Sequence, residues 1–589
     1  MAALYPDTLL TVDLSTQTID DEAVPDTWIH DFIGGKGIGA RYLYDAVGPG
    51  VDPLSAENVL LFLIGPLSGY LPGDARFCAI TKSPLTGLFL DSYAGGTFVP
   101  SFRTTYPSYL GIVIEGGTRN CCILDLRDNE PTLLETPSLV DAPIDAVDAE
   151  YPDASVVAVG PAGEAGVPFA SIGVDGGAHH AGRGGAGAVM GTKGLKAILL
   201  DQTDQIDPPT TELQSLKSSL ETDITESPYG DSYRTSGTME TIDIANELSI
   251  LPTRGWQRRV FDQTAAIGVD AVRAGANGRE RPDDPLPGDF RIGTDPMETV
   301  LRGGTPIALG STLGIGEFDA VAELGAACDR LGLDVISAGN AISLAIIASN
   351  QGRIDRELTF GEQGPLLELV DEIAHQSTPL GRILAGGVER AAMELELDDL
   401  IPTVKAMAVP SFDPRGAPAL ALAYATSDRG ACHRRAVPIT AELYTSRWTP
   451  TQTAKLTVAE QDRRALLWSL IVDDVMIPGL GDIGVEWLEA IGLTYSPDEL
   501  SRVGQRTWTM TRLFNAREGV TKPDDSVPAL FTTSDSRLDA ATFDRMRRRY
   551  YEWREWDRNG IPSRRLVDRL DLLSIVDDAT PLGDPPLHS

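Results

Sequence analysis

The sequence is poor in cysteine, and its few cysteines follow no ligand pattern. Five of the 589 residues are cysteine, and no two of them form a Cys-x-x-Cys pair. An odd, unpatterned set argues against a disulfide framework and gives no support for a zinc site or an iron–sulfur cluster. The five are Cys78, Cys121, Cys122, Cys328 and Cys432.

Long hydrophobic runs are also absent. The longest, near residues 59–71, is interrupted by Gly65, Pro66 and Gly69, whereas a membrane-spanning helix needs about 18 apolar residues. The first residues show neither the basic start nor the apolar segment of a secretion signal. We therefore expect a cytoplasmic protein that does not bind a membrane, and the chain length predicts more than one domain.

Positive charge is scarce, since 85 acidic residues face 49 basic ones for a formal net charge of −36. Nucleic-acid binding needs a basic face, so nucleic acid is not an expected partner. Only eight of the basic residues are lysine, and this composition fits a halophilic protein from a high-salt cytoplasm. Arginines and aromatic residues are interleaved at 545–565, which predicts a packed helix with outward arginines rather than an RNA site.

The order of apolar patterns predicts an α+β chain. Short apolar runs separated by Gly, Pro and Asp-rich turns indicate strands at 9–12, 59–64, 77–80, 111–114, 156–159 and 197–200. Helical periodicity follows at 318–330, 333–349, 364–374, 381–394, 458–475, 497–515 and 540–556. A polar stretch at 207–236 and a turn-rich one at 410–416 mark the domain boundaries. We predict a β-rich N-terminal domain, 1–206, and two mainly α-helical domains, 207–408 and 409–589.

The segment 181–196 has the composition of a phosphate-binding loop. It places six glycines around Arg183, Lys193 and Lys196, so backbone N–H groups can approach an anion while fixed positive charge faces it. The alternative is a flexible turn before a small helix. A second glycine turn, 34–39, opens a helix, but it is not a dinucleotide fingerprint because no clear strand precedes it and its spacing is wrong.

Two aspartates and a histidine are the other chemical candidates. Asp329 and Asp334 flank Gly332, and carboxylates so placed can accept hydrogen bonds from the amino and ring N–H groups of a heterocycle. A glycine helix cap followed by an aspartate N-cap explains the same pattern equally well. His433 is one of only six histidines and lies in a turn rich in arginine, which makes it a candidate general acid. The alternative for a single histidine is a structural role.

Eight motifs follow one another along nearly the whole chain: residues 34–41, 65–69, 82–87, 160–164, 181–196, 329–334, 413–416 and 512–519. In this order they resemble the tungsten-dependent aldehyde ferredoxin oxidoreductase family. The resemblance implies a β-rich domain and two helical domains with a tungsten or molybdenum bis-pyranopterin and magnesium between them. It also implies oxidation of an aldehyde to a carboxylate, transfer of electrons through a four-iron cluster to ferredoxin, and a homodimer.

The resemblance assigns roles to individual residues of this chain. His433 matches the proton-donating histidine of the family, and Arg435 matches a basic pterin contact. The remaining matches imply contacts to pterin phosphate or magnesium for Arg76, Tyr93, Gly95, Arg183 and Gly184, and contacts to one pterin ring for Asp329, Leu333 and Asp334.

The chain departs from the family at the cluster, the second pterin and the catalytic base. A four-iron cluster needs four thiolates, but the aligned positions are Val269, Val272, Ala276 and Asp473, so we expect no cluster. Trp468 replaces the aspartate that partners the second pterin, and Gly304 replaces the family's glutamate base.

Two functions remain open at this point. The first is an aldehyde oxidoreductase that binds the metal–pterin and passes electrons to ferredoxin or another carrier without a cluster of its own. The alternative is a non-catalytic paralogue that serves as a cofactor-binding scaffold or as the partner of an active family member. The retained phosphate loops and His433 favour the first, and the missing cysteines and glutamate favour loss of aldehyde chemistry.

Overall fold

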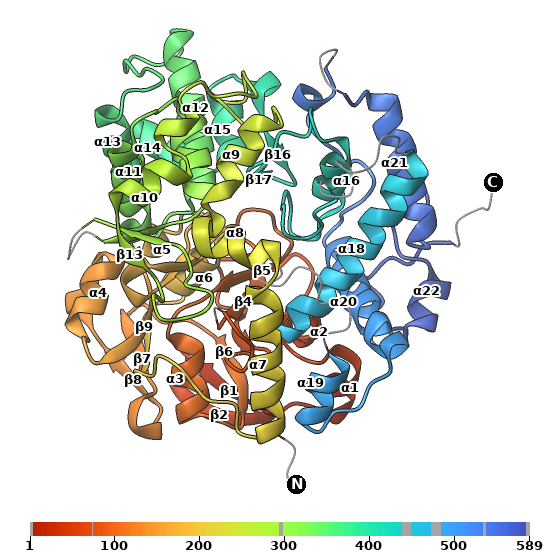
Figure 1. Cartoon of the computed structure of the whole chain (residues 1–589). Coiled ribbons are helices and arrows are strands. Elements are labelled where there is room, and N and C mark those ends of the chain that lie inside the picture. Colours follow the sequence, from red (N-terminus) through yellow and green to blue (C-terminus); the bar gives the residue numbers. More distant parts are fainter. Residues whose placement is uncertain are drawn as a thin grey trace.

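The computed structural model describes residues 4–73, 75–293, 298–438, 449–472, 484–533 and 537–584. Figure 1 shows the strands of the N-terminal part at the lower left, the green helices of the middle of the chain above them, and the blue C-terminal helices on the right. The predicted order, a β-rich part followed by mainly helical parts, is confirmed. No helix among the described residues is long and apolar enough to cross a membrane.

The first sheet has six strands in the order β2-β1-β6-β3-β4-β5. β1 is parallel to β6, and the other neighbours are antiparallel. Helix α2, Gly35–Ala46, packs on β3 and β4, and it approaches so closely that a Cβ on Gly39 would lie 2.2 Å from Ile80 Cδ1. The strands are β1 Thr8–Asp13, β2 Thr18–Ala23, β3 Leu60–Ile64, β4 Phe77–Lys82, β5 Phe89–Ala94 and β6 Tyr109–Glu115.

The second sheet also has six strands, in the order β11-β10-β9-β12-β7-β8. The predicted strands at 156–159 and 197–200 form its centre, and the four predicted in the first sheet are present there. Short helices α5, Pro161–Glu164, and α6, Ala186–Thr192, pack against each other beside it. The strands are β7 Cys122–Asp125, β8 Thr132–Glu135, β9 Ala154–Val159, β10 Ile172–Val174, β11 His179–Ala181 and β12 Leu195–Asp201.

The polar stretch at 207–236 contains two helices, α7 Thr211–Thr225 and α8 Pro228–Ser236, which the sequence reading did not predict. Each has a hydroxyl N-cap, because Thr210 Oγ1 accepts from Leu213 N and Ser227 Oγ accepts from Gly230 N. Only two residues of α7 are buried, so the apolar periodicity that announces a helix is weak here.

The middle of the chain is built around helix α12, Val335–Asn350, which is buried along nearly all of its length. Helix α11 ends at Gly332, whose φ of 74° is a left-handed C-cap. The helix predicted at 381–394 is interrupted at Gly387, with φ 90°, and forms two helices. The elements are α9 Glu240–Glu247, α10 Val269–Gly275, α11 Phe318–Leu331, α13 Gly364–His375, α14 Pro379–Ala385, α15 Val388–Glu394, and the strands β13 Ala276–Arg279, β14 Phe290–Ile292 and β15 Thr299–Leu301.

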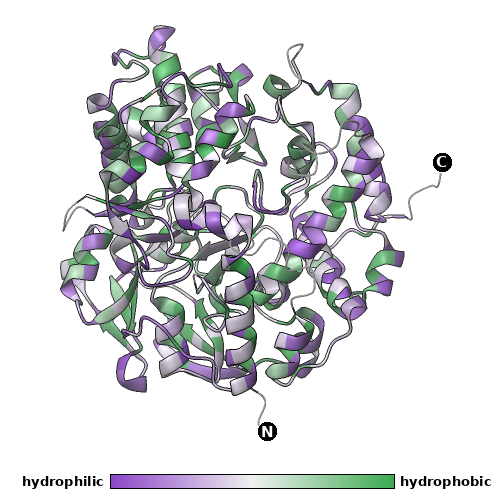
Figure 2. Cartoon of the chain, viewed as in Figure 1, coloured by the Kyte–Doolittle hydropathy of each residue, from purple (hydrophilic) through white to green (hydrophobic). Residues whose placement is uncertain are grey.

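The C-terminal part packs its helices against the first sheet through α2. Helices α18 and α20 contact each other, and both contact α2. Helix α21 buries Phe543, Met546, Tyr550 and Tyr551, so the predicted packed helix is confirmed, and hydrophilic and hydrophobic residues alternate along it in Figure 2. The elements are β16 Thr403–Val404, β17 Met407–Ala408, α16 Pro418–Thr426, α18 Pro450–Leu470, α19 Val485–Ala490, α20 Pro497–Arg517, α21 Ala540–Trp553 and α22 Arg564–Arg569.

Candidate functional site

A cavity of about 600 Å³ lies where the N-terminal sheets, the middle helices and the C-terminal part meet. Its wall takes residues from β5, β11, α8, α9, the start of α12 and the loop after α16. Nine of the ten residues that the sequence singled out line this cavity, although they come from distant parts of the chain. They are Arg76, Tyr93, Gly95, Arg183, Asp329, Leu333, Asp334, His433 and Arg435.

Gly184, the tenth, is not among the residues that line the cavity. Its φ of 77° is left-handed, and a Cβ at this position would lie 2.5 Å from Leu90 Cδ1. Its carbonyl oxygen accepts a hydrogen bond of 2.7 Å from Ser83 Oγ. The glycine is therefore needed to shape the loop that carries Arg183.

Arg183 lines the cavity, is bound by backbone carbonyl oxygens and keeps one nitrogen without a hydrogen-bond partner among the described residues. Its Nη2 donates to the carbonyl oxygens of Ala408 and Ala431, and its Nε lies 3.5 Å from Asp334 Oδ2. Nη1 is buried and has no hydrogen-bond partner among the described residues. An N–H group in this position is suited to a buried anion.

Arg435 is held in the same way by acidic residues. Its Nη2 pairs with Asp91 Oδ1 and also donates to the Asp91 carbonyl oxygen over 3.1 Å, and its Nε lies 3.3 Å from Asp428 Oδ1. Burial disfavours the guanidinium, but these carboxylates and Cys432 raise the pKa of Arg435. Its Nη1 is buried and has no hydrogen-bond partner in the described part of the chain.

The two lysines of the glycine-rich segment do not face this cavity, and the prediction that they face the anion is wrong. Lys193 Nζ donates to the carbonyl oxygens of Asn58 and Gly116 over 2.5 and 2.7 Å. Lys196 Nζ pairs with Glu164 and donates to a backbone carbonyl. Both ammonium groups are bound by protein oxygens, and of the three cations in this segment only Arg183 lines the cavity.

Asp329 is paired with a histidine that the sequence reading missed. Asp329 Oδ1 lies 3.3 Å from His180 Nε2, and Thr299 Oγ1 donates to Asp329 Oδ2 over 2.6 Å. Burial raises the pKa of Asp329 and lowers that of His180. Two of the chain's six histidines are adjacent at 179–180, which is the one signal that could have pointed to them.

Asp334 is the N-cap of α12, as the structural alternative for this residue predicted. Its Oδ2 accepts from Ser337 N over 2.9 Å and from Ser337 Oγ over 2.5 Å. Its Oδ1 accepts no hydrogen bond from the described residues, and the residue lines the cavity. One carboxylate oxygen therefore stabilises the helix while the other is open to a donor.

His433 is half-buried, and its imidazole lies among arginines that favour its neutral form. Burial and the guanidinium groups of Arg434, Arg183 and Arg429 lower the pKa of His433 well below its usual value. Its Nδ1 has no hydrogen-bond partner among the residues described. In the protein alone these groups therefore disfavour protonation of the imidazole, and entry of an anion would make the protonated, proton-donating form more favourable.

Cys432, next to this histidine, is a thiol whose ionisation the same arginines favour. Its Sγ accepts from Arg429 Nη2 over 3.1 Å and from Arg434 N over 3.4 Å. Burial opposes ionisation, but Arg429, Arg435 and Arg183 together lower the pKa of Cys432 to about 7. The lowered pKa values of His433 and Cys432 both reflect an excess of positive charge at this wall of the cavity.

Trp468 fills the space beside Tyr93. The two ring centroids are 3.9 Å apart, with the planes inclined by 33°, and the Arg434 guanidinium lies 5.3 Å from the Trp468 ring. Tyr93 OH donates to Asp91 Oδ2 over 2.7 Å. An indole therefore stands at the position where the family resemblance implies an aspartate.

An ion cluster on the opposite wall was not predicted from the sequence. Arg302 Nη2 lies 2.9 Å from Glu280 Oε1, and Arg302 Nη1 lies 3.4 Å from Asp289 Oδ2. Burial raises the pKa of Asp289 to about 6, while Arg302 and His179 overcome burial and lower the pKa of Glu280. Thr238 donates to Asp289 through its backbone N and its hydroxyl.

The positions aligned with cluster cysteines lie in an apolar cluster. Val272 is fully buried and belongs to a group with Met239, Phe290, Ile292, Leu301 and Ala322, against which Val269 and Ala276 pack. Asp473 lies outside the described residues. Among the residues described, no group of three or more His, Cys, Asp or Glu side chains could hold a metal ion. Gly304 lines the cavity without a side chain.

Positive charge dominates the lining. Seven arginines and four carboxylates line the cavity of a chain whose formal net charge is −36. The local excess of cations in an acidic protein indicates an anionic ligand. The arginines are Arg76, Arg183, Arg302, Arg429, Arg434, Arg435 and Arg464.

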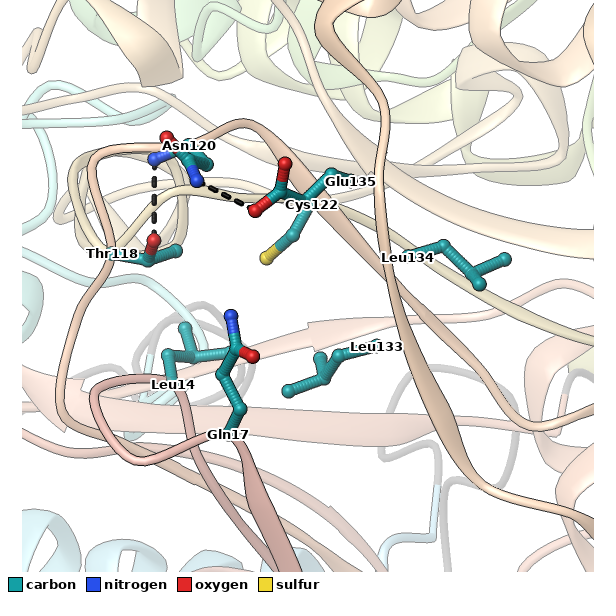
Figure 3. Close-up of a pocket in the computed structure, with 8 residues that line it drawn as sticks. All are labelled: Leu14, Gln17, Thr118, Asn120, Cys122, Leu133, Leu134 and Glu135. Carbon is teal, nitrogen blue, oxygen red and sulfur yellow. Dashed lines mark hydrogen bonds between the residues drawn. The ribbon is translucent and has the colours of Figure 1, made fainter.

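A second pocket lies at one end of the N-terminal sheets (Figure 3). Its volume is about 20 Å³, which is enough for about one water molecule. Asn120 N donates to Thr118 Oγ1, and Asn120 Nδ2 donates to Glu135 Oε1 over 2.7 Å. The pocket is too small for an organic cofactor.

Comparison with known proteins shows the same architecture and a clear family. Residues 9–202 match the model of the aldehyde ferredoxin oxidoreductase N-terminal domain, and residues 215–572 match that of domains 2 and 3. The chain belongs to the aldehyde ferredoxin oxidoreductase family. The resemblance drawn from the eight motifs is thereby confirmed.

Relatives of this family member cover nearly its full length. The tungsten-containing aldehyde ferredoxin oxidoreductases of Pyrococcus abyssi and Pyrococcus horikoshii are each 29% identical to it, over 95% of this chain and 98% of theirs. The WOR-like subunit of an aliphatic sulfonate oxidoreductase from Pyrococcus furiosus is 26% identical over 96% of this chain and 97% of its own. The active site complex BamBC of benzoyl coenzyme A reductase contains a chain of the same fold, with a TM-score of 0.85, 22% identity and 98% coverage of both chains.

Proposed function

We propose that this family member is an oxidoreductase that converts an aldehyde to a carboxylic acid at a tungsten or molybdenum bis-pyranopterin bound in the arginine-lined cavity. The overall reaction takes one aldehyde and one water to one carboxylic acid, two electrons and two protons. Tungsten-containing relatives at 29% identity support the choice of cofactor and reaction.

The observation that carries the proposal is the pair of prepared guanidinium groups in the cavity. Arg183 and Arg435 are each bound on one side by the protein and each keep a buried Nη1 without a hydrogen-bond partner among the described residues. A buried unsatisfied donor costs about 1–3 kcal/mol, more when charged, so such donors are expected to meet a ligand. Phosphate groups of a pyranopterin have the charge and the acceptor oxygens that fit them.

The positions of the residues in the cavity lining indicate which of them would hold the cofactor. Arg76, Arg183 and Arg435 supply cations for phosphate, with magnesium as a counter-ion near Tyr93 and Gly95. Asp329, Asp334 and the backbone at Leu333 supply acceptors for the N–H groups of a pterin ring, and all of these positions line the cavity.

When bound, the metal–pterin supplies the two-electron redox chemistry, and the protein supplies proton transfer. His433 is the proton-transfer residue that the lining offers, because its imidazole is neutral and its Nδ1 has no hydrogen-bond partner in the described part of the chain. Asp289 is a poor base because Thr238 and Arg302 already occupy its oxygens.

Electrons leave the cofactor by a route other than the four-iron cluster that the family resemblance implies. Val269, Val272 and Ala276 fill the cluster positions with aliphatic side chains, which cannot ligate iron. We propose that ferredoxin or another small carrier takes electrons from the cofactor without a four-iron cluster in this chain.

Aldehyde-dependent reduction of an artificial electron acceptor tests the reaction. The cofactor-loaded protein should reduce a viologen dye with a set of small aldehydes, and His433→Gln should lower kcat by about 10²- to 10⁴-fold, the usual contribution of a general acid or base. A loaded protein without aldehyde-dependent turnover would contradict the proposal and favour a non-catalytic cofactor-binding paralogue.

A further inference from the structure

Lys36, in the glycine turn that opens α2, does not face the cavity. Its Nζ lies 3.0 Å from Asp91 Oδ2 and 2.5 Å from Asp428 Oδ2, and its side chain is completely buried. The same two carboxylates hold Arg435. Lys36, Asp91, Asp428 and Arg435, here called the charge quartet, thus alternate in sign.

The charge quartet joins segments that are far apart in the sequence. Lys36 comes from α2, Asp91 from β5, and Asp428 and Arg435 from the loop after α16. No side chain of the four is more than 2% exposed, so solvent does not screen the charges. Two cations and two anions leave the quartet neutral.

Each carboxylate depends on both cations. Burial alone would raise the pKa of Asp91, but the Arg435 guanidinium and the Lys36 ammonium hold it well below its ordinary value. Without Lys36, the two buried carboxylates would keep the Arg435 guanidinium and the Arg429 guanidinium that also lowers the pKa of Asp91, but neither carboxylate would have an ammonium beside it. Uncompensated buried charge is strongly unfavourable, so the pair would rearrange or take up a proton.

The quartet also restricts the direction of Arg435. Nη2 is hydrogen-bonded to Asp91, and Nε lies 3.3 Å from Asp428 Oδ1 as an ion pair without a hydrogen bond. Because the guanidinium is planar, these contacts limit the orientation of Nη1. Nη1 is the buried nitrogen without a hydrogen-bond partner among the described residues, and Arg435 lines the cavity. A donor held in place in advance binds an anion without a further loss of side-chain entropy.

We propose that Lys36 and Asp428 are positioning residues, which hold Arg435 through a neutral charge quartet so that it binds the anionic group of the cofactor. This role rests on the proposed function in one respect only, because both require that an anion binds in the cavity. Lys36 is thereby a counter-ion to carboxylates rather than an anion-binding lysine of a glycine loop.

A charge-compensation experiment tests the proposal on protein prepared without cofactor, with inorganic phosphate as the probe in equilibrium dialysis. Lys36→Met leaves the quartet with a net negative charge and should weaken phosphate binding at least 10-fold. Asp428→Asn leaves it with a net positive charge but keeps an amide oxygen beside Nε of Arg435. The double variant Lys36→Met/Asp428→Asn removes one charge of each sign and should recover binding to within about threefold of the wild type.

Lys193→Met is the matched control, since Lys193 is also buried but donates to carbonyl oxygens away from the cavity. It should lower the midpoint of urea unfolding and leave the phosphate affinity unchanged. Loss of binding in this control as well would show that the losses at Lys36 come from general destabilisation.

The outcomes separate the two proposals. Wild-type protein that binds no phosphate would overturn the anion site itself. If the wild-type protein binds phosphate but the double variant binds it no better than Lys36→Met does, the positioning role is overturned. Losses of affinity caused by packing add in a double variant, whereas losses caused by unbalanced charge cancel. If Lys36→Met alone does not fold, a folded double variant with restored binding supports the quartet, and failure of both variants contradicts it.

Discussion

Trp468 lies against Tyr93 with ring centroids 3.9 Å apart, and Tyr93 lines the cavity. Trp468 is 1% exposed and occupies the position at which the family resemblance implies an aspartate. An aromatic wall here supports Tyr93, whose hydroxyl donates to Asp91 of the charge quartet. Packing has therefore replaced a polar contact beside the proposed cofactor.

Trp468→Ala should lower the free energy of unfolding by about 3–5 kcal/mol, because it removes a large buried ring and leaves a cavity. The measurement is urea unfolding followed by circular dichroism. Trp553→Ala is the control, since Trp553 is 46% exposed, and its cost should stay below about 1 kcal/mol. Equal losses for the two would show that the contact with Tyr93 contributes little.

His433 should give the stability of the cofactor-free protein a pH dependence. Burial and neighbouring guanidiniums lower its pKa in the folded state, so below the unfolded pKa of about 6.5 the unfolded chain binds more protons. Stability is then fully present above about pH 6.5 and falls as the pH falls below it.

His433→Gln should make that loss shallower between about pH 6.5 and 5. His180, whose pKa burial also lowers, acts with the same sign, so part of the slope will remain. The measurement is the unfolding midpoint in urea at several pH values. A variant with an unchanged slope would contradict the assignment of a neutral buried imidazole at this position.

Arg183→Lys should reduce cofactor content strongly although it keeps the charge. The ammonium cannot replace a planar guanidinium that binds the carbonyl oxygens of Ala408 and Ala431 and keeps a further nitrogen, Nη1, without a hydrogen-bond partner among the described residues. Tungsten, molybdenum and pterin per folded protein would be measured. Arg548→Lys, on the exposed face of α21, is the control, and wild-type content in both variants would count against a role for Arg183.

The purified protein should contain no bound iron and no broad visible absorbance that dithionite bleaches. Val272 and its neighbours form an apolar group, and the chain has only five cysteines, none in a cluster pattern. Iron at four atoms per chain with that absorbance would show that other residues hold a cluster.

Sequence alone located the strands made of continuous apolar runs, because β3, β9 and most of β12 are buried on both faces. It missed β5, whose centre contains the buried Asp91, and the three-residue strands β10 and β11. Their periodicity is too short or too polar to be recognised.

The candidate site was predictable only where residue types follow one another in a motif. Arg183, Asp334 and His433 stand in such motifs and meet in one cavity. The pairing that holds Arg435 was not predictable, since Lys36 and Asp428 are 392 positions apart. No local pattern records a pairing of that range, and for the same reason the sequence could not show that Lys193 and Lys196 are bound by carbonyl and carboxylate groups.

Elemental and pterin analysis of the protein from its native host tests the central claim most directly. Tungsten, molybdenum and iron would be measured by mass spectrometry, and pterin by its fluorescence after oxidation. We expect one tungsten or molybdenum per chain, two pterins per metal and no iron. Protein that is folded but free of metal and pterin would contradict it and leave the cavity as the site of a different anion.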